Sequence, residues 1–85
     1  MKTLAEIQNY FNTIEDFGVF NIKEGRKTVC KITKYKNKKT NIVSYTVSYF
    51  GLCAEYIELK DAYKKVLFAM QIHEETIQML LTTNL

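Results

Sequence analysis

A strand is expected over residues 41–49, where residues 43–49 alternate between two kinds of side chain, and this alternation constrains the fold more than any other feature of the 85-residue chain. Val43, Tyr45, Val47 and Tyr49 would face one side of a strand, and the serines and threonine between them would face the other. The apolar side of such a strand must be covered. The pattern therefore predicts a sheet with helices packed on one face.

A second strand is expected over residues 28–36, immediately upstream. A tight turn at Asn37 and Lys38 would join it to the strand that follows. This turn sets Ile32 opposite Val43, so that apolar side chains of both strands meet on one face.

A further strand near residues 19–23 would complete an antiparallel meander of three strands. Phe20 belongs on its apolar face, opposite Cys30, and Ile22 belongs on the same face. We expect a three-residue loop over residues 24–26, because a two-residue loop would turn polar side chains toward the core.

Helical spacing flanks the strands on both sides. Thr3 and Glu6 have the spacing of a capping box, and the apolar residues after them predict a helix near residues 4–16, with Gly18 as its stop. Apolar residues with heptad spacing predict a second helical region over residues 54–82.

One unbroken helix over that region would be about 43 Å long, against a width of roughly 30 Å for a domain of this size. A break near residues 71–73 would let the last part fold back, and it is favoured because His73 interrupts the apolar seam. A monomer would follow. An unbroken helix would instead project Ile77, Leu80 and Leu81 for pairing with a second copy of the chain.

The chain is thus expected to form a single α+β domain over residues 1–85. Its order would be an N-terminal helix, a three-stranded antiparallel β-meander, and then one long or two consecutive C-terminal helices packed on one sheet face. The hydrophobic content of 47% suits a globular domain. No stretch approaches the length of a membrane span, and the first residues lack a signal peptide's apolar run, which favours a cytoplasmic location with reduced cysteines.

Few residues offer catalytic or metal-binding chemistry. His73 begins a sequence like that of a metalloprotease helix, but Ile77 stands where the second histidine is required. Cys30 and Cys53 do not have the spacing of a structural zinc site. The sequence therefore predicts a protein that is not an enzyme and uses no metal or cofactor.

Charge is concentrated in one segment. Residues 23–39 carry eight Lys or Arg against Glu24 alone, whereas the segments on either side are net acidic or uncharged. Such a surface favours an anionic partner, with lysines neutralising phosphates and Tyr35 able to stack on an unpaired base. The candidate binding residues lie on the predicted strand over residues 28–36 and in the turns on either side of it: Arg26, Lys27, Lys31, Lys34, Tyr35, Lys36, Lys38 and Lys39.

The expected function is that of a small binding module whose basic hairpin contacts nucleic acid or a nucleic-acid-loaded protein. The element order over residues 3–70 resembles that of the double-stranded-RNA-binding domain, although residues 54–58 are acidic where that family has lysines. The alternative is a small protein–protein inhibitor or adaptor. Helix, three strands and two helices is an order also found among phage inhibitors such as some anti-CRISPR proteins. A lysine-rich edge that deters aggregation would explain the charge without any ligand.

Overall fold

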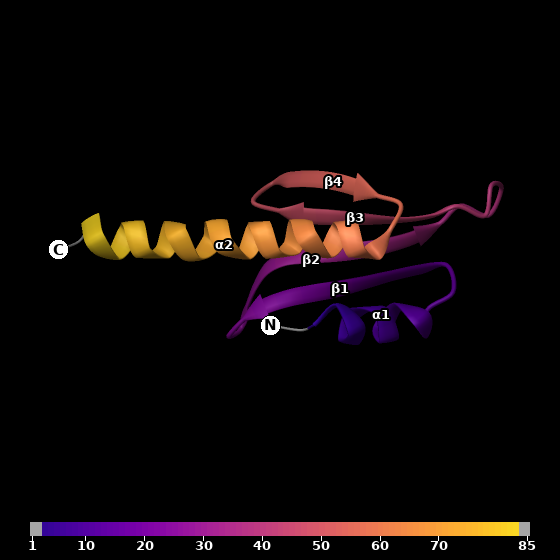
Figure 1. Cartoon of the computed structure of the whole chain (residues 1–85), viewed down its shortest axis with the longest axis horizontal. Helices are drawn as coiled ribbons and strands as arrows, with labels where there is room; N and C mark the ends of the chain where they lie inside the picture. The colour runs from indigo at the N-terminus through magenta and orange to yellow at the C-terminus, as the bar shows by residue number, and fades with distance from the viewer. Residues whose placement is uncertain (1–2, 84–85) are drawn as a thin grey trace.

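The computed structural model describes residues 3–83 and has the expected α+β fold, in which two helices cover one face of an antiparallel sheet (Figure 1). The strands lie in chain order in one four-stranded sheet, so there is one strand more than the three expected. The elements are α1 (Leu4–Asn12), β1 (Phe17–Glu24), β2 (Lys27–Lys36), β3 (Val43–Tyr49), β4 (Leu52–Tyr56) and α2 (Leu59–Thr83).

Helix α1 begins at the predicted capping box. The Glu6 amide donates to the Thr3 hydroxyl oxygen over 3.2 Å, and the Glu6 carboxylate reaches back to the Thr3 amide. The helix ends at Asn12, before the predicted residue 16, and Gly18 lies inside β1 rather than at the helix end. A Cβ on Gly18 would lie 2.5 Å from Ile14 Cδ1, so this glycine lets the connection from α1 pack closely on β1.

The β1–β2 hairpin has a two-residue loop, Gly25 and Arg26, where three residues were expected. Val29 is skipped in the register, which makes it a β-bulge, and the bulge shifts the alternation of β2 by one residue. Phe20 and Ile22 therefore face the core despite the shorter loop. Phe20 pairs with Ile32, not with Cys30 as predicted.

The β2–β3 connection spans residues 37–42, and the predicted two-residue turn at Asn37 and Lys38 is wrong. The Asn37 side-chain oxygen accepts from the amides of Lys39 and Thr40 at 2.9 and 3.4 Å, and Asn41 adopts a φ of 58°. Ile32 consequently pairs with Val47 instead of Val43. This shift moves each partner by an even number of residues, so the predicted apolar face is retained.

Strand β4 includes residues 54–56, which were predicted to be helical. Phe50 and Gly51 both have positive φ, 48° and 79°, and form the two-residue loop between β3 and β4 that a type I′ turn provides. The helix consequently begins at Leu59 rather than at Ala54. The extra strand also removes the resemblance in element order to the double-stranded-RNA-binding domain.

Helix α2 is continuous, so the predicted break near residues 71–73 does not occur. His73 instead marks the end of the packed part: its Nε2 lies 3.1 Å from Glu24 Oε2, and its ring stacks on Phe50. Residues 74–82 are all exposed. In Figure 1, α2 runs past the β1–β2 and β3–β4 turns, which gives the molecule its 55 Å length.

One core holds the layers together. Val47 is fully buried as predicted, and Tyr45 is partly buried, with its ring 5.7 Å from that of Phe11. Within residues 3–83, no helix combines the length and apolar character needed to cross a membrane. The buried members come from both helices and three strands: Ile7, Phe11, Ile22, Cys30, Ile32, Val47, Tyr49, Ala62, Val66 and Ala69.

Candidate nucleic-acid interface

The structure distributes the predicted basic residues along the whole of β2, a strand of ten residues that is about 33 Å long. Arg26 and Lys27 lie at the β1–β2 turn, at the end of the sheet past which α2 projects (Figure 1). Lys31 lies between the ends, on the face without helices. Lys36, Lys38 and Lys39 lie at the opposite end, so the basic segment does not form one patch.

Lys34 faces the helices and is partly buried. Its ammonium group donates to the carbonyl oxygens of Phe11 and Ile14, at 3.0 and 2.8 Å. The Phe11 carbonyl lies in the last turn of α1 and also accepts from the Ile14 amide, and the Ile14 carbonyl follows the helix. A positive charge is favourable near the C-terminal end of a helix. Because this ammonium is engaged inside the fold, Lys34 is not part of the open surface.

Phe17 and Tyr35 lie directly opposite each other on β1 and β2, on the sheet face that no helix covers. They are 61% and 54% exposed, so neither ring is used to fill the core. Two large aromatic side chains are thus exposed on adjacent strands, at the end of the sheet where β1 begins.

Three lysines lie at the same end of the sheet as this aromatic pair. Lys36 ends β2, and Lys38 and Lys39 lie in the β2–β3 loop that follows. Together with Phe17 and Tyr35 they line an open hollow of about 560 Å³, to which Asp16 and Asn37 also contribute. We call the five residues Phe17, Tyr35, Lys36, Lys38 and Lys39 the aromatic–lysine end.

Hydrogen bonds hold the backbone of this region in place. The Lys36 amide donates to the Asp16 carbonyl over 2.8 Å, which ties β2 to the start of β1. The Asn37 side chain orders the following loop, as described above. The Asp16 carboxylate lies 3.7 Å from the Lys38 ammonium on the surface, so it reduces the positive charge of the hollow.

Phe17 was not among the residues predicted from the sequence. The predicted first helix ends near residue 16 and the predicted first strand begins near residue 19, so Phe17 lay between them without an assigned role. Its position opposite Tyr35 depends on the register of β1 with β2, which the sequence alone did not specify. A strand beginning two residues earlier would have placed it on the open face with Val19 and Asn21.

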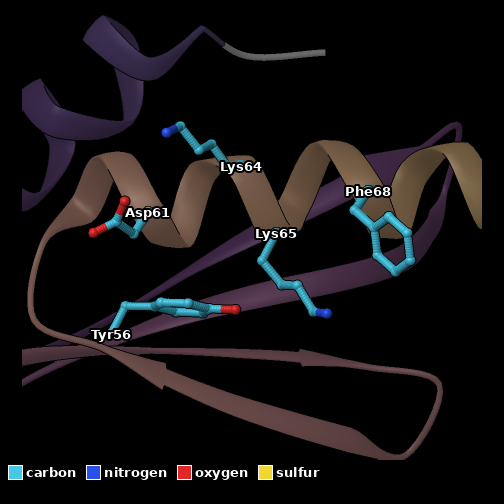
Figure 2. Close-up of a pocket in the computed structure, with 5 residues that line it drawn as sticks. All are labelled: Tyr56, Asp61, Lys64, Lys65 and Phe68. Carbon is cyan, nitrogen blue, oxygen red and sulfur yellow. The ribbon is translucent and has the colours of Figure 1, made fainter.

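A second hollow, of about 460 Å³, lies between α2 and β4 (Figure 2). Lys65 reaches into it between Tyr56 and Phe68, while Lys64 points away. The Lys65 ammonium lies 4.7 Å from the ring centroid of Phe68 and 5.4 Å from that of Tyr49, and hydrogen bonding to Tyr49 raises the pKa of Lys65. The protein's own aromatic rings stabilise the Lys65 charge. We therefore interpret Lys65 as part of the packing of α2 on the sheet.

Nucleophilic and metal-binding groups are sparse in the described part of the chain. Between residues 3 and 83 there is no group of three or more His, Cys, Asp or Glu that could hold a metal ion. Cys30 is buried, and burial raises the pKa of its thiol to about 11. Cys53 is exposed on the open face, with its sulfur 3.4 Å from the Ser48 hydroxyl.

No protein-family model, curated protein or solved structure matches this chain. A function must therefore be inferred from the geometry of the molecule itself.

Proposed function

We propose that this protein is a non-enzymatic module that binds single-stranded nucleic acid through the aromatic–lysine end. The observation that carries the proposal is the exposed Phe17–Tyr35 pair on adjacent strands, flanked by three lysines. Aromatic side chains that stack on bases, next to cations that neutralise the backbone, are the two components of single-strand binding.

The exposed rings favour a single strand over a duplex. In a duplex the base faces are already stacked on one another, whereas an unpaired base can stack on Phe17 or Tyr35. Each such contact is worth about 1–3 kcal/mol and depends little on the identity of the base. The lysines add contacts to phosphate, which are also independent of sequence. The proposed binding is therefore tolerant of sequence and requires no cofactor.

Lys31 extends the proposed surface along the open face of the sheet. It lies beside the hydroxyl-bearing strand β3, where Ser48 is its partner in the register. Thr33, Ser44 and Thr46 carry further hydroxyls on the same face. Such groups can donate to phosphate oxygens, so a strand leaving the aromatic pair would meet polar partners there. We place this module in the cytoplasm, in keeping with its two free cysteines.

The second candidate is an inhibitor or adaptor, for example of phage or mobile-element origin, that uses the same end against a nucleic-acid-binding or acidic protein. Exposed aromatic side chains favour it too, because they are enriched at protein interfaces. Such a protein would not bind short oligonucleotides by itself.

Fluorescence anisotropy with labelled oligo-dT and oligo-U of about 12 nucleotides tests the proposal. We expect binding at about 50 mM salt that weakens at about 200 mM. Phe17→Ala and Tyr35→Ala should each lower the affinity about tenfold or more. Phe68→Ala is the matched control, because this ring is 49% exposed but lies on α2 away from the site.

Two results would overturn the proposal. One is no binding of either oligonucleotide by the folded parent at low salt, which would leave the inhibitor as the surviving candidate. The other is binding that Phe17→Ala and Tyr35→Ala weaken no more than Phe68→Ala does, because the aromatic pair would then have no role.

A further inference from the structure

The end of α2 is exposed and has no charged side chains. Residues 76–83 contain no Asp, Glu, Lys or Arg. Ile77, Leu80 and Leu81 are 38%, 59% and 63% exposed, and the sheet ends before it can cover them. A helical end of this length is only marginally stable in water by itself, so its apolar side chains are expected to be covered by another surface.

These apolar residues continue the stripe by which α2 packs on the sheet. Val66 and Met70 belong to the core-facing side, His73 follows at its edge, and Ile77 and Leu80 continue with steps of three and four residues. The helix extends about 15 Å beyond His73, and the stripe covers about 11 Å of that length. The part of the stripe beyond His73 therefore faces solvent, past the end of the sheet.

The composition of this segment argues against a membrane or a nucleic acid as its partner. Helices that lie on membranes carry Lys or Arg on their polar face, whereas this segment has none and follows Glu74 and Glu75. A nucleic acid would require positive charge, which is also missing here. An apolar helix of similar length is the better match.

We infer that the end of α2 pairs with the same segment of a second copy, in an antiparallel two-fold dimer. Pairing centred between Gln78 and Met79 sets Ile77 of one copy opposite Leu80 of the other. Each projecting helix would then take the place of the sheet beneath its partner helix, so the helix-on-sheet layering continues from one copy into the next.

Charge complementarity supports the second copy as the occupant. In this arrangement the end of each α2 points at the β1–β2 turn of the other copy, where Arg26 and Lys27 are exposed. The last turn of α2 has no basic residue to offset the partial negative charge of its carbonyl groups. The other copy's turn would supply that charge, and half-exposed Phe50 lies at the same end of the sheet.

Sedimentation velocity over a range of protein concentrations tests the dimer. The parent should sediment as a species of twice the 10.0 kDa chain mass. Leu80→Glu should weaken association at least about tenfold, because it places a carboxylate in an apolar interface. The matched control is Met79→Glu: Met79 is 68% exposed but lies on the opposite side of the helix, so this variant should remain dimeric.

A charge pair tests the antiparallel register. Ile77→Glu and Leu80→Lys should each dissociate the dimer, and the double variant should restore it, because each new carboxylate would face a new ammonium group of the other copy. Arg26→Glu should weaken the parent dimer by at least about threefold through the lost contact with the helix end. The packed part of the domain should stay folded in every variant, because all these side chains are exposed in the single chain. The helical signal in circular dichroism should fall only in the variants that dissociate, because the end of α2 is then uncovered.

A parent that stays at 10.0 kDa at the highest concentrations would overturn the inference, as would equal dissociation by Met79→Glu and Leu80→Glu. If the double variant associates no better than either single variant, the antiparallel register is excluded. These results are separable from oligonucleotide binding, because the aromatic–lysine end lies at the other end of the sheet (Figure 1).

Discussion

The Lys34 ammonium lies 2.8 Å from the carbonyl oxygen of Ile14, so a side chain of β2 holds the connection that follows the first helix. The same ammonium donates to the Phe11 carbonyl. A residue that looks from the sequence like one more surface lysine thus joins α1 to β2. Its loss should affect folding and not ligand binding.

Lys34→Met should lower the free energy of unfolding by about 1–2 kcal/mol, because a charged donor to the helix end is lost while the aliphatic part of the side chain is kept. Urea denaturation measures this change. Lys36→Met is the control and should change stability by less than about 0.5 kcal/mol. Equal effects of the two substitutions would show that the contact to α1 contributes nothing.

Asp16→Asn should strengthen oligonucleotide binding. The Asp16 carboxylate lies 3.7 Å from Lys38 and repels phosphate, so its removal should raise affinity about two- to fivefold at low salt and less at high salt. Anisotropy titrations measure the change. Glu75→Gln is the control, because it removes the same charge from the part of α2 at the opposite end of the sheet, and it should have a smaller effect (Figure 1). A parent-like affinity for Asp16→Asn would argue that phosphate does not approach Lys38.

The sequence was sufficient to predict which face of each central strand is buried. Alternation in residues 43–49 has a period of two, so an error of an even number of residues in the pairing of β2 with β3 left every apolar side chain on its correct face. The capping box was equally local, since Thr3 and Glu6 contact each other within one turn. Patterns that depend on neighbouring residues were therefore reliable.

Other features depended on contacts between distant segments and were missed. Tyr56 fits both the alternation of β4 and the helical spacing that follows, so the strand was assigned to the helix. The bulge at Val29 offsets a β1–β2 loop that is one residue shorter than predicted, and neither feature has a clear sequence pattern of its own. The position of Phe17 depends on the register of β1 with β2, and the contact of Lys34 depends on the path of α1. No short sequence pattern specifies either of them.

The Cys30 thiol should make stability fall at alkaline pH. Burial raises its pKa from 9.0 to about 11, so the folded protein keeps a proton that the unfolded chain loses above pH 9. The resulting contribution is fully present below pH 9 and is lost as pH rises toward 11. The difference in free energy of unfolding between the parent and Cys30→Ala should therefore be constant from about pH 6 to 8 and shrink above pH 9. Urea denaturation across this range checks it, and a constant difference throughout would contradict it.

Gly18→Ala should be destabilising because of Ile14. The added methyl group would lie 2.5 Å from Ile14 Cδ1 and 2.9 Å from its Cγ2, so the isoleucine or the start of β1 must move, at a cost of about 1–3 kcal/mol. The contact can be isolated with a double-mutant cycle, since Ile14→Ala removes the three atoms nearest to the new methyl group. In that background Gly18→Ala should cost at least about 0.5 kcal/mol less than in the parent. Thermal or urea unfolding of the four proteins measures the coupling, and strictly additive effects would mean that Gly18 is required by the strand itself rather than by the packing of Ile14.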